Sequence, residues 1–449
     1  MSAGDTIYAE STAPGRAAVA VVRISGRNTW ECLVGLGITQ ALTPRSAALR
    51  RLRDPGLGLD LDQALVLWFP APASFTGEDV AELQVHGGRT VVAAIAAVLS
   101  RMDDVRAAEP GEFTRRAVLN GRLDLTEAEG LIDLIDAETE AQRQQAVRQM
   151  GGALGRMYES WRHGLIARLA HLEAYIDFPE EELPIDLVRD CKADLAGISE
   201  EMSTHLADRR RGELLRDGYR VAIVGPPNAG KSSLLNCIAG RDVAIVSERA
   251  GTTRDVIEVR LSLAGYPVIL ADTAGIRDAL DEIEEEGVAR ARAWAGEADL
   301  RLIVVDIGSP VEANRTILEF GAGHHLVVGN KIDAQMNVED HPRALEGMIL
   351  VSATTGAGVL ELLDRLKDEA VASMGVGEAP ALTRERHRAA LSDCVGALTR
   401  FHGWSGGEER LELAVEDLRR AADALGRITG KTDVEELLDV IFRDFCIGK

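Results

Sequence analysis

The sequence predicts a multidomain fold with an α/β N-terminal domain, an all-α helical domain and an inserted P-loop α/β domain. Three observations predict it. The chain has 449 residues, more than one hydrophobic core usually spans, so about two to four domains are expected. Between Tyr219 and about Leu366, short apolar runs alternate with helical stretches, which is typical of a parallel sheet covered by helices. Helical apolar patterning lies on both sides of that segment.

Residues 1–118 are predicted to form the N-terminal domain. The apolar runs Ala17–Ile24 and Ala64–Phe69 are bounded by glycine or proline, which is typical of buried strands. Val91–Leu99 is predicted to be a short helix. Turn-rich segments, Ser74–Asp79 and Glu109–Phe113, separate these elements. Together they favour a mixed α/β domain.

Residues 119–217 and 371–449 are predicted to form one discontinuous helical domain, interrupted by the α/β domain at 218–370. Thr126 followed by Glu129 has the spacing of a capping box, which predicts a helix start there. Neither helical half shows a self-sufficient bundle, so the two halves are expected to pair in space. The apolar runs inside the inserted segment begin at Val221, Val268, Leu302, Leu326 and Met348 and predict its strands.

Composition argues against several classes of protein. The formal net charge of −22 disfavours a stand-alone nucleic-acid binder, because phosphate contacts need clustered Lys and Arg, although a partner can carry RNA. No apolar stretch has the length of a membrane span, and the N-terminus has no secretion or import pattern. The 5 cysteines form no CxxC pair, which argues against a zinc site or disulfide framework. A cytoplasmic location is expected.

Gly225–Ser232 reads GPPNAGKS, a complete GxxxxGK[ST] motif between an apolar strand and a helical run. Its backbone amides can hold phosphate oxygens at the positive end of the following helix. Lys231 can reach the outer phosphates, and Ser232 can offer its hydroxyl to magnesium. A chance glycine-rich turn is the alternative, but it does not explain the strand and helix on either side.

Asn330–Asp333 reads NKID and predicts that the nucleotide is GTP rather than ATP. Asp333 can accept hydrogen bonds from the two donors on the Watson–Crick edge of guanine, a donor pair that adenine lacks. An isolated NKxD is usually only a helix start, but its order behind a P-loop favours base recognition. Ser352 and Ala353, after the next strand, are expected to contact the base through their backbone.

Two further motifs complete a Ras-like G domain. Asp272–Gly275 (DTAG) can reach magnesium through water and sense the γ-phosphate, and one threonine of Gly251–Asp255 can complete the magnesium shell. Ile276 stands where Ras-like GTPases have a water-orienting Gln, and an apolar side chain cannot orient water. The acidic run Asp281–Glu286 follows. Most of it is interpreted as a solvated helix face, but one carboxylate can instead position water.

These ordered motifs resemble the TrmE family in the TrmE-Era-Septin group of GTPases, and the resemblance covers nearly the whole chain. It includes the segments Ala13–Gly26, Ser74–Gly88, Pro110–Leu125 and, most specifically, the terminal Phe445–Lys449 (FCIGK). The resemblance implies a folate-binding N-terminal domain that forms a homodimer. It also implies potassium-dependent association of G domains, followed by GTP hydrolysis.

The resemblance also implies a role in tRNA modification. With the FAD-dependent protein MnmG, in a heterotetramer, such a protein adds a carboxymethylaminomethyl or aminomethyl group at C5 of the wobble uridine of certain tRNAs. A 5-formyl or 5,10-methylene tetrahydrofolate supplies the carbon, and the tRNA is expected to bind largely through the partner. The implied cofactors are GTP, Mg²⁺, K⁺ and the tetrahydrofolate derivative.

The resemblance assigns roles to individual residues. Glu284 aligns with the catalytic glutamate, while Ser232 and Thr253 are implied magnesium ligands. Implied potassium ligands are Asn228, Ser247, Arg249 and Thr252, the last three through backbone carbonyls. Together with the motifs above, the nucleotide-binding set comprises Asn228, Ala229, Gly230, Lys231, Ser232, Ser233, Ser247, Glu248, Arg249, Ala250, Gly251, Thr252, Thr253, Asp272, Thr273, Ala274, Gly275, Asn330, Lys331, Asp333, Ser352, Ala353 and Thr354.

The implied folate-binding residues are Arg23, Glu82, Arg122 and Lys449. Arg122 stands where the family is expected to have Lys, so a guanidinium fork replaces a point donor at that contact. Cys446 is interpreted either as a functional thiol near the folate or as a small buried hydrophobe.

Two alternatives from other functional classes remain. A purely regulatory GTPase would bind effectors and catalyse no modification, but it does not need Arg23, Glu82 and Lys449. A ribosome-assembly GTPase of the Era kind would normally carry a basic RNA-binding module, and this acidic chain shows none.

Overall fold

The computed structural model describes residues 4–177, 187–241, 243–245, 257–272, 296–334, 347–375, 380–405, 411–432, 438, 441–442, 445 and 448. The chain divides into two compact units. One comprises Met1–Ile132, Gln149–Leu187 and Gly403–Lys449, and the other comprises Asp133–Arg148 and Val188–His402. No helix in the described ranges has both the length and the apolar character that crossing a bilayer requires. The predicted domain boundaries at 118, 217 and 370 stay predictions.

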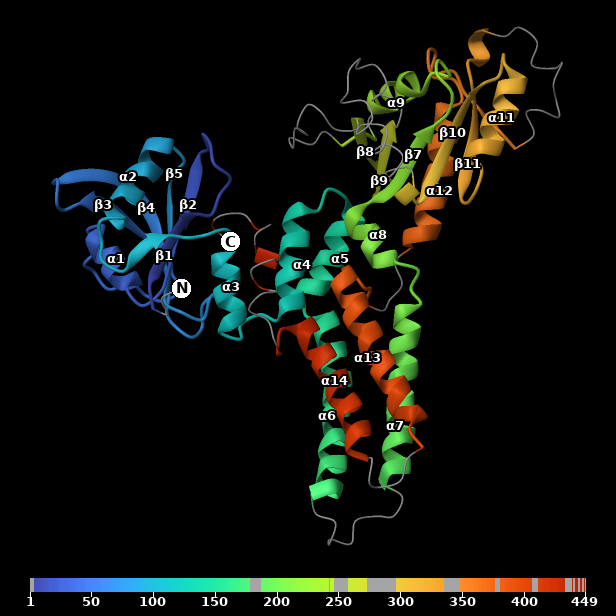
Figure 1. Cartoon of the computed structure of the whole chain (residues 1–449). Coiled ribbons are helices and arrows are strands. Elements are labelled where there is room, and N and C mark those ends of the chain that lie inside the picture. The colour runs from blue at the N-terminus through green and yellow to red at the C-terminus, as the bar shows by residue number, and fades with distance from the viewer. Residues whose placement is uncertain are drawn as a thin grey trace, which may run out of the picture. The chain divides into compact units, whose positions relative to one another are not determined.

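A six-stranded sheet forms the core of the N-terminal domain, in the order β3-β4-β5-β2-β1-β6 (Figure 1). Its strands are β1 (Thr6–Glu10), β2 (Val19–Ser25), β3 (Ala48–Asp54), β4 (Leu59–Phe69), β5 (Val80–His86) and β6 (Val105–Ala107). Neighbouring strands are antiparallel except β1 and β6, which are parallel. The predicted strands at 17–24 and 64–69 are confirmed as β2 and the end of β4, and the predicted helix lies within α2 (Arg89–Leu99).

The two faces of this sheet have different roles. Val22 and Ile24 of β2 pack in a core cluster that includes Leu33 of α1 (Thr29–Gly35) and Ile95 of α2. Because strand side chains alternate between faces, Arg23 points to the opposite face. On that face Phe113 of α3 (Glu112–Leu119) packs with residues of β1.

Helix α4 (Leu125–Asp136) begins with a capping box, but not the predicted one. The Asp124 carboxylate accepts the Glu127 amide at 2.8 Å, and the Glu127 carboxylate accepts the Asp124 amide at 2.8 Å. The prediction of a Thr126–Glu129 box was therefore wrong by two residues. Thr126 lies inside the first turn, and its hydroxyl donates to the Asp124 carboxylate instead.

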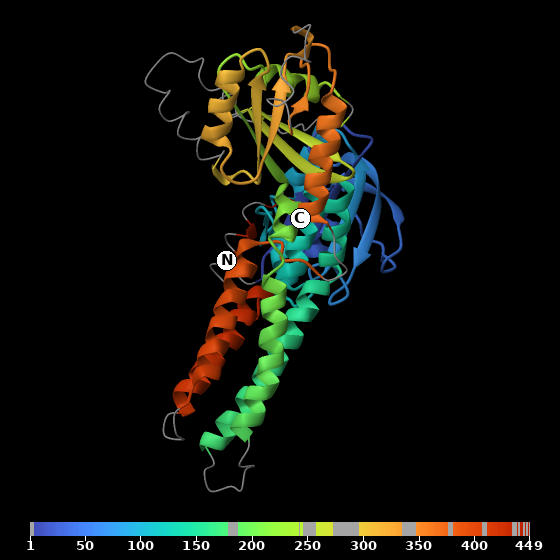
Figure 2. The ribbon, with the colours of Figure 1, turned by 90° about the vertical axis from the view of Figure 1, so that its right-hand side faces the viewer.

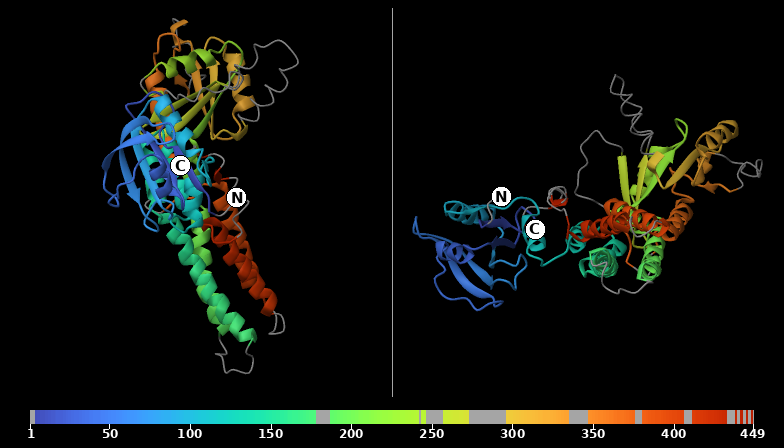
Figure 3. Two further views of the ribbon diagram at one scale, coloured as in Figure 1. Left: turned by 90° about the vertical axis from the view of Figure 1, so that its left-hand side faces the viewer. Right: turned by 60° about the horizontal axis from the view of Figure 1, so that its bottom comes forward.

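The remaining helices are divided between the two units. In the first unit, α6 (Ala153–Asp177) packs along α14 (Leu411–Thr429), as Figure 1 and Figure 3 show. The second unit contains α5 (Glu140–Met150) up to Arg148, α7 (Leu187–Leu206) from Val188, α8 (Arg211–Asp217) and α13 (Glu385–Gly403) up to His402. Where the chain enters the α/β domain, the Arg388 guanidinium of α13 pairs with Asp208 at 2.6 Å and Glu213 at 2.8 Å.

The inserted α/β domain contains a second sheet, whose strands run in colour from green to orange in Figure 2. It has six strands in the order β12-β11-β10-β7-β9-β8. Its strands are β7 (Tyr219–Val224), β8 (Ile257–Leu263), β9 (Tyr266–Asp272), β10 (Leu300–Asp306), β11 (His325–Asn330) and β12 (Ile349–Leu350). All neighbours are parallel except β8 and β9. The predicted, mostly parallel sheet is therefore confirmed.

Helices cover both faces of this sheet, as the alternating pattern predicts. Val221 and Ile223 of β7 pack in one cluster with residues of α9 (Lys231–Ala239) and α12 (Val359–Met374). Ala222 and Val224 pack in another cluster that includes Ala313 of α11 (Pro310–Phe320). The parallel arrangement brings the carboxyl ends of β7, β9, β10 and β11 to one edge, where the predicted nucleotide motifs lie.

Candidate functional site

The phosphate loop follows β7 directly and requires unusual backbone geometry. Gly225 has φ +150°, and a Cβ at this position would lie 2.2 Å from the Val304 carbonyl oxygen of β10. Asn228 has φ 61°, a left-handed conformation that Asn tolerates better than most side chains. Gly230 has φ +89° and caps the N-terminus of α9. The loop therefore leads from the sheet edge into the positive end of a helix, as phosphate binding requires.

The lysine and serine of the P-loop have defined partners. Lys231 is a buried residue, and its ammonium donates to the Gly225 carbonyl at 3.1 Å and the Pro226 carbonyl at 2.7 Å. The Ser232 hydroxyl donates to the buried carboxylate of Asp272, at the end of β9. Two oxygen atoms that are predicted to face magnesium therefore lie side by side, although their residues are 40 positions apart in the sequence. Hydroxyl and carboxylate oxygens are the donors that this hard cation prefers, so the pair fits Mg²⁺.

Asn330 connects the phosphate loop with the loop after β12. Its side chain is 1% exposed, its Nδ2 donates to the Ala229 carbonyl at 2.8 Å, and its Oδ1 accepts the Ala353 amide at 3.0 Å. In the loop after β12, the Ser352 hydroxyl accepts a hydrogen bond from the Thr355 amide at 3.0 Å, which stabilises the turn between these two residues. Asn330 thus holds together the two loops predicted to contact phosphate and base.

The other residues of the base motif lie at the end of β11. Lys331 has φ 69° and pairs with Asp306 of β10 at 2.8 Å. Asp333 lies exposed in a short 3₁₀ helix, Ile332–Ala334. Thr354 is likewise exposed. An accessible carboxylate at the carboxyl edge of the sheet is suited to reading a base.

In the N-terminal domain, two predicted folate residues form one pair. Arg23 and Glu82 face each other across β2 and β5, with Arg23 Nη2 2.9 Å from Glu82 Oε1 and side chains 20% and 23% exposed. The Arg23 guanidinium carbon lies 5.3 Å from the ring centroid of Phe75 and 5.6 Å from that of Phe113. The pair therefore lies beside aromatic walls and remains partly accessible to a ligand.

Arg122 and Gly448 lie against the same domain. A Cβ on Gly77 would lie 3.2 Å from the Arg122 side chain, so Arg122 packs beside the 74–79 segment that contains Phe75. Arg122 itself is exposed. The Gly448 carbonyl accepts a hydrogen bond from the Ser11 hydroxyl at 2.9 Å, which places Gly448 next to the end of β1. Since Arg23 stands opposite Ala9 of β1 in the sheet, Gly448 and Arg23 lie in the same region.

Comparisons with known proteins agree over the whole chain. The family model of the MnmE helical domain matches residues 125–446, and that of the GTP-binding protein TrmE N-terminus matches residues 6–122. The tRNA modification GTPase MnmE of Parvibaculum lavamentivorans is 55% identical, covering 99% of this chain and 100% of that protein. The chain belongs to the MnmE family of tRNA modification GTPases.

Further relatives support this assignment. The tRNA modification GTPase MnmE of Paramagnetospirillum magneticum is 52% identical, covering 99% of this chain and 100% of that protein. The mitochondrial 5-taurinomethyluridine-[tRNA] synthase subunit GTPB3 of Danio rerio is 46% identical, covering 99% of this chain and 93% of that protein. The family resemblance expected from the motifs is thus confirmed.

Some predicted site residues of this MnmE-family chain lie outside the described residues. They are Ser247, Glu248, Arg249, Ala250, Gly251, Thr252, Thr253, Thr273, Ala274, Gly275, Glu284, Cys446 and Lys449. Ile276 and the acidic run 281–286 lie outside them too. Their roles stay predictions.

Three contributors to these sites were missed by sequence reasoning. Phe75 and Phe113 lie in segments quoted for the family resemblance, but their packing on Arg23 depends on the tertiary fold. Asp306 is the last residue of β10, and a charged residue at the end of a buried apolar run was the available signal. The role of each of these three residues depends on partners that are distant in the sequence.

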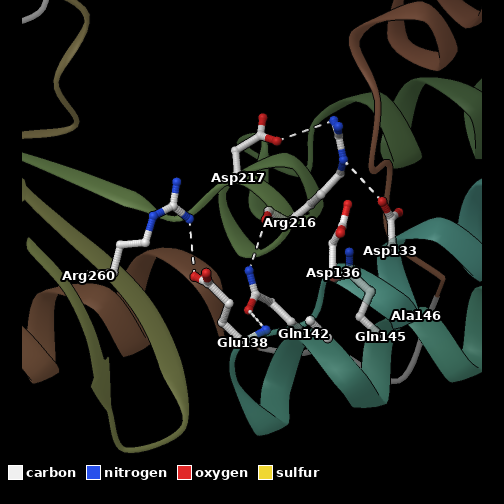
Figure 4. Close-up of a pocket in the computed structure, with 10 residues that line it drawn as sticks. Asp133, Asp136, Glu138, Gln142, Gln145, Ala146, Arg216, Asp217 and Arg260 are labelled. Atoms are coloured by element: carbon white, nitrogen blue, oxygen red, sulfur yellow. Dashed lines mark hydrogen bonds and ion pairs between the residues drawn. The ribbon is translucent and has the colours of Figure 1, made fainter. Parts of the chain in front are cut away.

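A polar cavity of about 210 Å³ lies beside the α/β domain, lined in part by Asp133, Glu138, Gln142, Arg216 and Arg260 (Figure 4). Arg260 of β8 pairs with Glu138 at 3.1 Å, and the Gln142 amide donates to the Arg216 carbonyl at 3.0 Å. At the N-terminus of α5, the Ala141 amide donates to the Gly265 carbonyl at 3.1 Å, in the β8–β9 turn. The bonds of Glu138 and Ala141 link residues 133–148 to the α/β domain, and that of Gln142 links them to α8, all within the second unit.

Proposed function

We propose that this chain is a potassium-activated GTPase that works with the flavoprotein MnmG to modify wobble uridines in tRNA. The contact of Ser232 with Asp272 carries the GTPase part, because it brings together the two motifs that hold magnesium in P-loop GTPases. The bond of Asn330 to the phosphate loop supports it further. Ser232 and Thr253 would hold Mg²⁺, which would neutralise charge on the β- and γ-phosphates.

Lys231 would exchange the loop carbonyls of Gly225 and Pro226 for the outer phosphate oxygens when GTP binds. Glu284 would orient the attacking water, since Ile276 occupies the position of the usual Gln. The water oxygen forms a bond to the γ-phosphorus while the bond to the β–γ bridging oxygen breaks, giving GDP and phosphate.

Potassium would be held by Asn228 and by backbone carbonyls of Ser247, Arg249 and Thr252. Of these, Asn228 lies in the described part of the chain, exposed in the phosphate loop, so its amide oxygen is accessible to a cation. The ion would supply positive charge near the transferring phosphoryl group, where other GTPases use an arginine finger.

The N-terminal site would take a 5-formyl or 5,10-methylene tetrahydrofolate through Arg23, Glu82, Arg122 and Lys449. The residues fit a pterin ring, which needs polar partners at its edge and an apolar wall at its face. The Arg23–Glu82 pair offers the first, and Phe75 offers the second. The addition at C5 of uridine would then draw its carbon from this site.

The chain would act as a homodimer and as a heterotetramer with MnmG in the cytoplasm, with tRNA bound largely through that partner. A net charge of −22 supports indirect binding of tRNA. A purely regulatory GTPase is the second candidate, but the Arg23–Glu82 pair beside aromatic rings favours a ligand site in the N-terminal domain.

Two measurements test the proposal. GTP hydrolysis should be about tenfold or more faster in K⁺ than in Na⁺ at equal ionic strength, because the cation stabilises charge in the transition state. Asn228→Ala should remove most of that difference and leave nucleotide binding intact, whereas equal wild-type rates in both salts contradict potassium activation. Mass analysis of tRNA from cells lacking the gene should show unmodified wobble uridines. If the wobble uridines are modified as in the wild type, the role in tRNA modification is contradicted and only the proposed GTPase activity stands.

A further inference from the structure

Asp306 lies next to the base motif for a reason of sheet geometry. It ends β10, and in the parallel register of β10 and β11 it stands opposite Asn330, the first residue of NKID. Its Oδ2 pairs with the Lys331 ammonium at 2.8 Å, and its Oδ1 accepts the Gly308 amide at 2.8 Å. The hydrogen bond from the Gly308 amide fixes the Asp306 carboxylate in place. The flexible Lys331 side chain is therefore held by a group that does not move with it.

The lysine needs such an anchor because it lies two residues before the carboxylate proposed to read guanine. Lysine is a flexible point charge, and an ammonium pairs with whichever carboxylate is within reach. Asp333 is exposed, and no ion pair involves it in the part of the chain that the structure describes. An ammonium paired with Asp333 would occupy the lone pairs that the guanine donors need.

We propose that Asp306 is a positioning residue for base specificity, which holds the Lys331 ammonium away from the Asp333 carboxylate. The backbone of the motif is already fixed by the two side-chain bonds of Asn330, so the lysine side chain is the part left to position. Burial raises the pKa of Asp306, but the bonds from Lys331 and the Gly308 amide outweigh it and leave the pKa below its ordinary value. Asp306 is therefore charged at neutral pH.

The inference rests on the proposed reading of guanine by Asp333, and Asp306→Asn in the full chain tests it. The probes are GDP and IDP labelled on the ribose with a methylanthraniloyl group, because hypoxanthine lacks the exocyclic amino group of guanine. The Kd for labelled GDP should rise about fivefold, as expected for loss of one partly exposed ion pair, and that for labelled IDP by about twofold or less. The preference for guanine should therefore fall.

Asp364→Asn is the matched control. Asp364 also pairs with a lysine at 2.8 Å, Lys367, but within α12 rather than beside the base motif. This variant should bind both nucleotides as the wild type does. If Asp306→Asn instead weakens GDP and IDP equally, or leaves GDP affinity unchanged, the specificity role is overturned.

A double-mutant cycle gives a second, independent result. In a Lys331→Met background there is no ammonium to restrain, so Asp306→Asn should change GDP affinity by less than about 1.5-fold. An undiminished effect in that background would show a structural role and overturn the proposal. Asp333→Asn separates this result from the proposed base site: if it leaves GDP affinity unchanged, base reading by Asp333 itself is wrong.

Discussion

Replacing Asn330 by Ala should destabilise the α/β domain, because this one side chain holds two loops together. The change deletes the donor to the Ala229 carbonyl at 2.8 Å and the acceptor of the Ala353 amide at 3.0 Å. At 1% exposure, water cannot easily replace either bond. The phosphate loop and the loop after β12 would then lose their direct connection.

The expected cost is the sum of the contributions of those two bonds. Each contributes about 1–1.5 kcal/mol, so a total of about 2–3 kcal/mol is expected. For a unit of this size, 1 kcal/mol corresponds to a shift of about 2–4 °C in Tm, so the transition should fall by roughly 5–10 °C.

Calorimetry of the full chain measures this, and the relevant transition is the one that GDP shifts upward. Asn120→Ala is the control, since the Asn120 amide donates to the Thr76 carbonyl at 2.7 Å in the N-terminal domain. It should leave the GDP-dependent transition in place. Asn330→Asp keeps the acceptor but sets an oxygen against the Ala229 carbonyl, so it should lower the Tm at least as much as Ala. A shift below about 1 °C for Asn330→Ala would refute the reasoning.

Three further outcomes are expected. Asp333→Asn should weaken GTP binding about 100-fold or more and favour xanthine nucleotides, because the carboxylate accepts two bonds; a titration showing wild-type GTP affinity would contradict base reading. Arg23→Ala should raise the Kd for 5-formyltetrahydrofolate roughly 10- to 100-fold in calorimetric titrations. The control, Arg27→Ala, removes an exposed arginine paired with Asp104 at 2.7 Å and should leave this Kd unchanged. If Arg23→Ala binds the folate as tightly as the wild type, the proposed folate site is wrong. Burial raises the pKa of Glu112, but the hydrogen bonds from Arg106, the Glu109 amide and Arg116 outweigh burial and lower this pKa below the ordinary 4.5. The ionised Glu112 therefore stabilises the folded state above pH 4.5, and this contribution is lost as the pH falls through the lowered pKa. Thermal melts between pH 6 and 3 should show this acid loss and a flatter profile for Glu112→Gln, and identical profiles would exclude the role.

The sequence alone determined the nucleotide-binding fold, because its signals are local. A phosphate loop needs glycines, a lysine and a serine at fixed spacing between one strand and one helix, and all of these lie within Tyr219–Ala239. The parallel sheet was likewise predicted from apolar runs alone, since burial on both faces leaves no polar alternation.

Long-range pairing was decided by the tertiary structure. Arg23 and Glu82 were each predicted to bind folate, but only the register of β2 and β5 makes them one ion pair, and only packing brings Phe75 and Phe113 to it. The Asp306–Lys331 pair likewise depends on two parallel strands being neighbours.

The start of α4 shows the same limit within one helix. Two overlapping capping boxes are compatible with the sequence, and the folded chain uses Asp124 with Glu127 rather than Thr126 with Glu129. Residues 133–148 look like part of a continuous helical region, yet they belong to the second unit and bond to the α/β domain through Glu138 and Ala141. Periodicity specifies that a helix forms and which of its faces is apolar, whereas its partner depends on contacts between segments that the sequence keeps far apart.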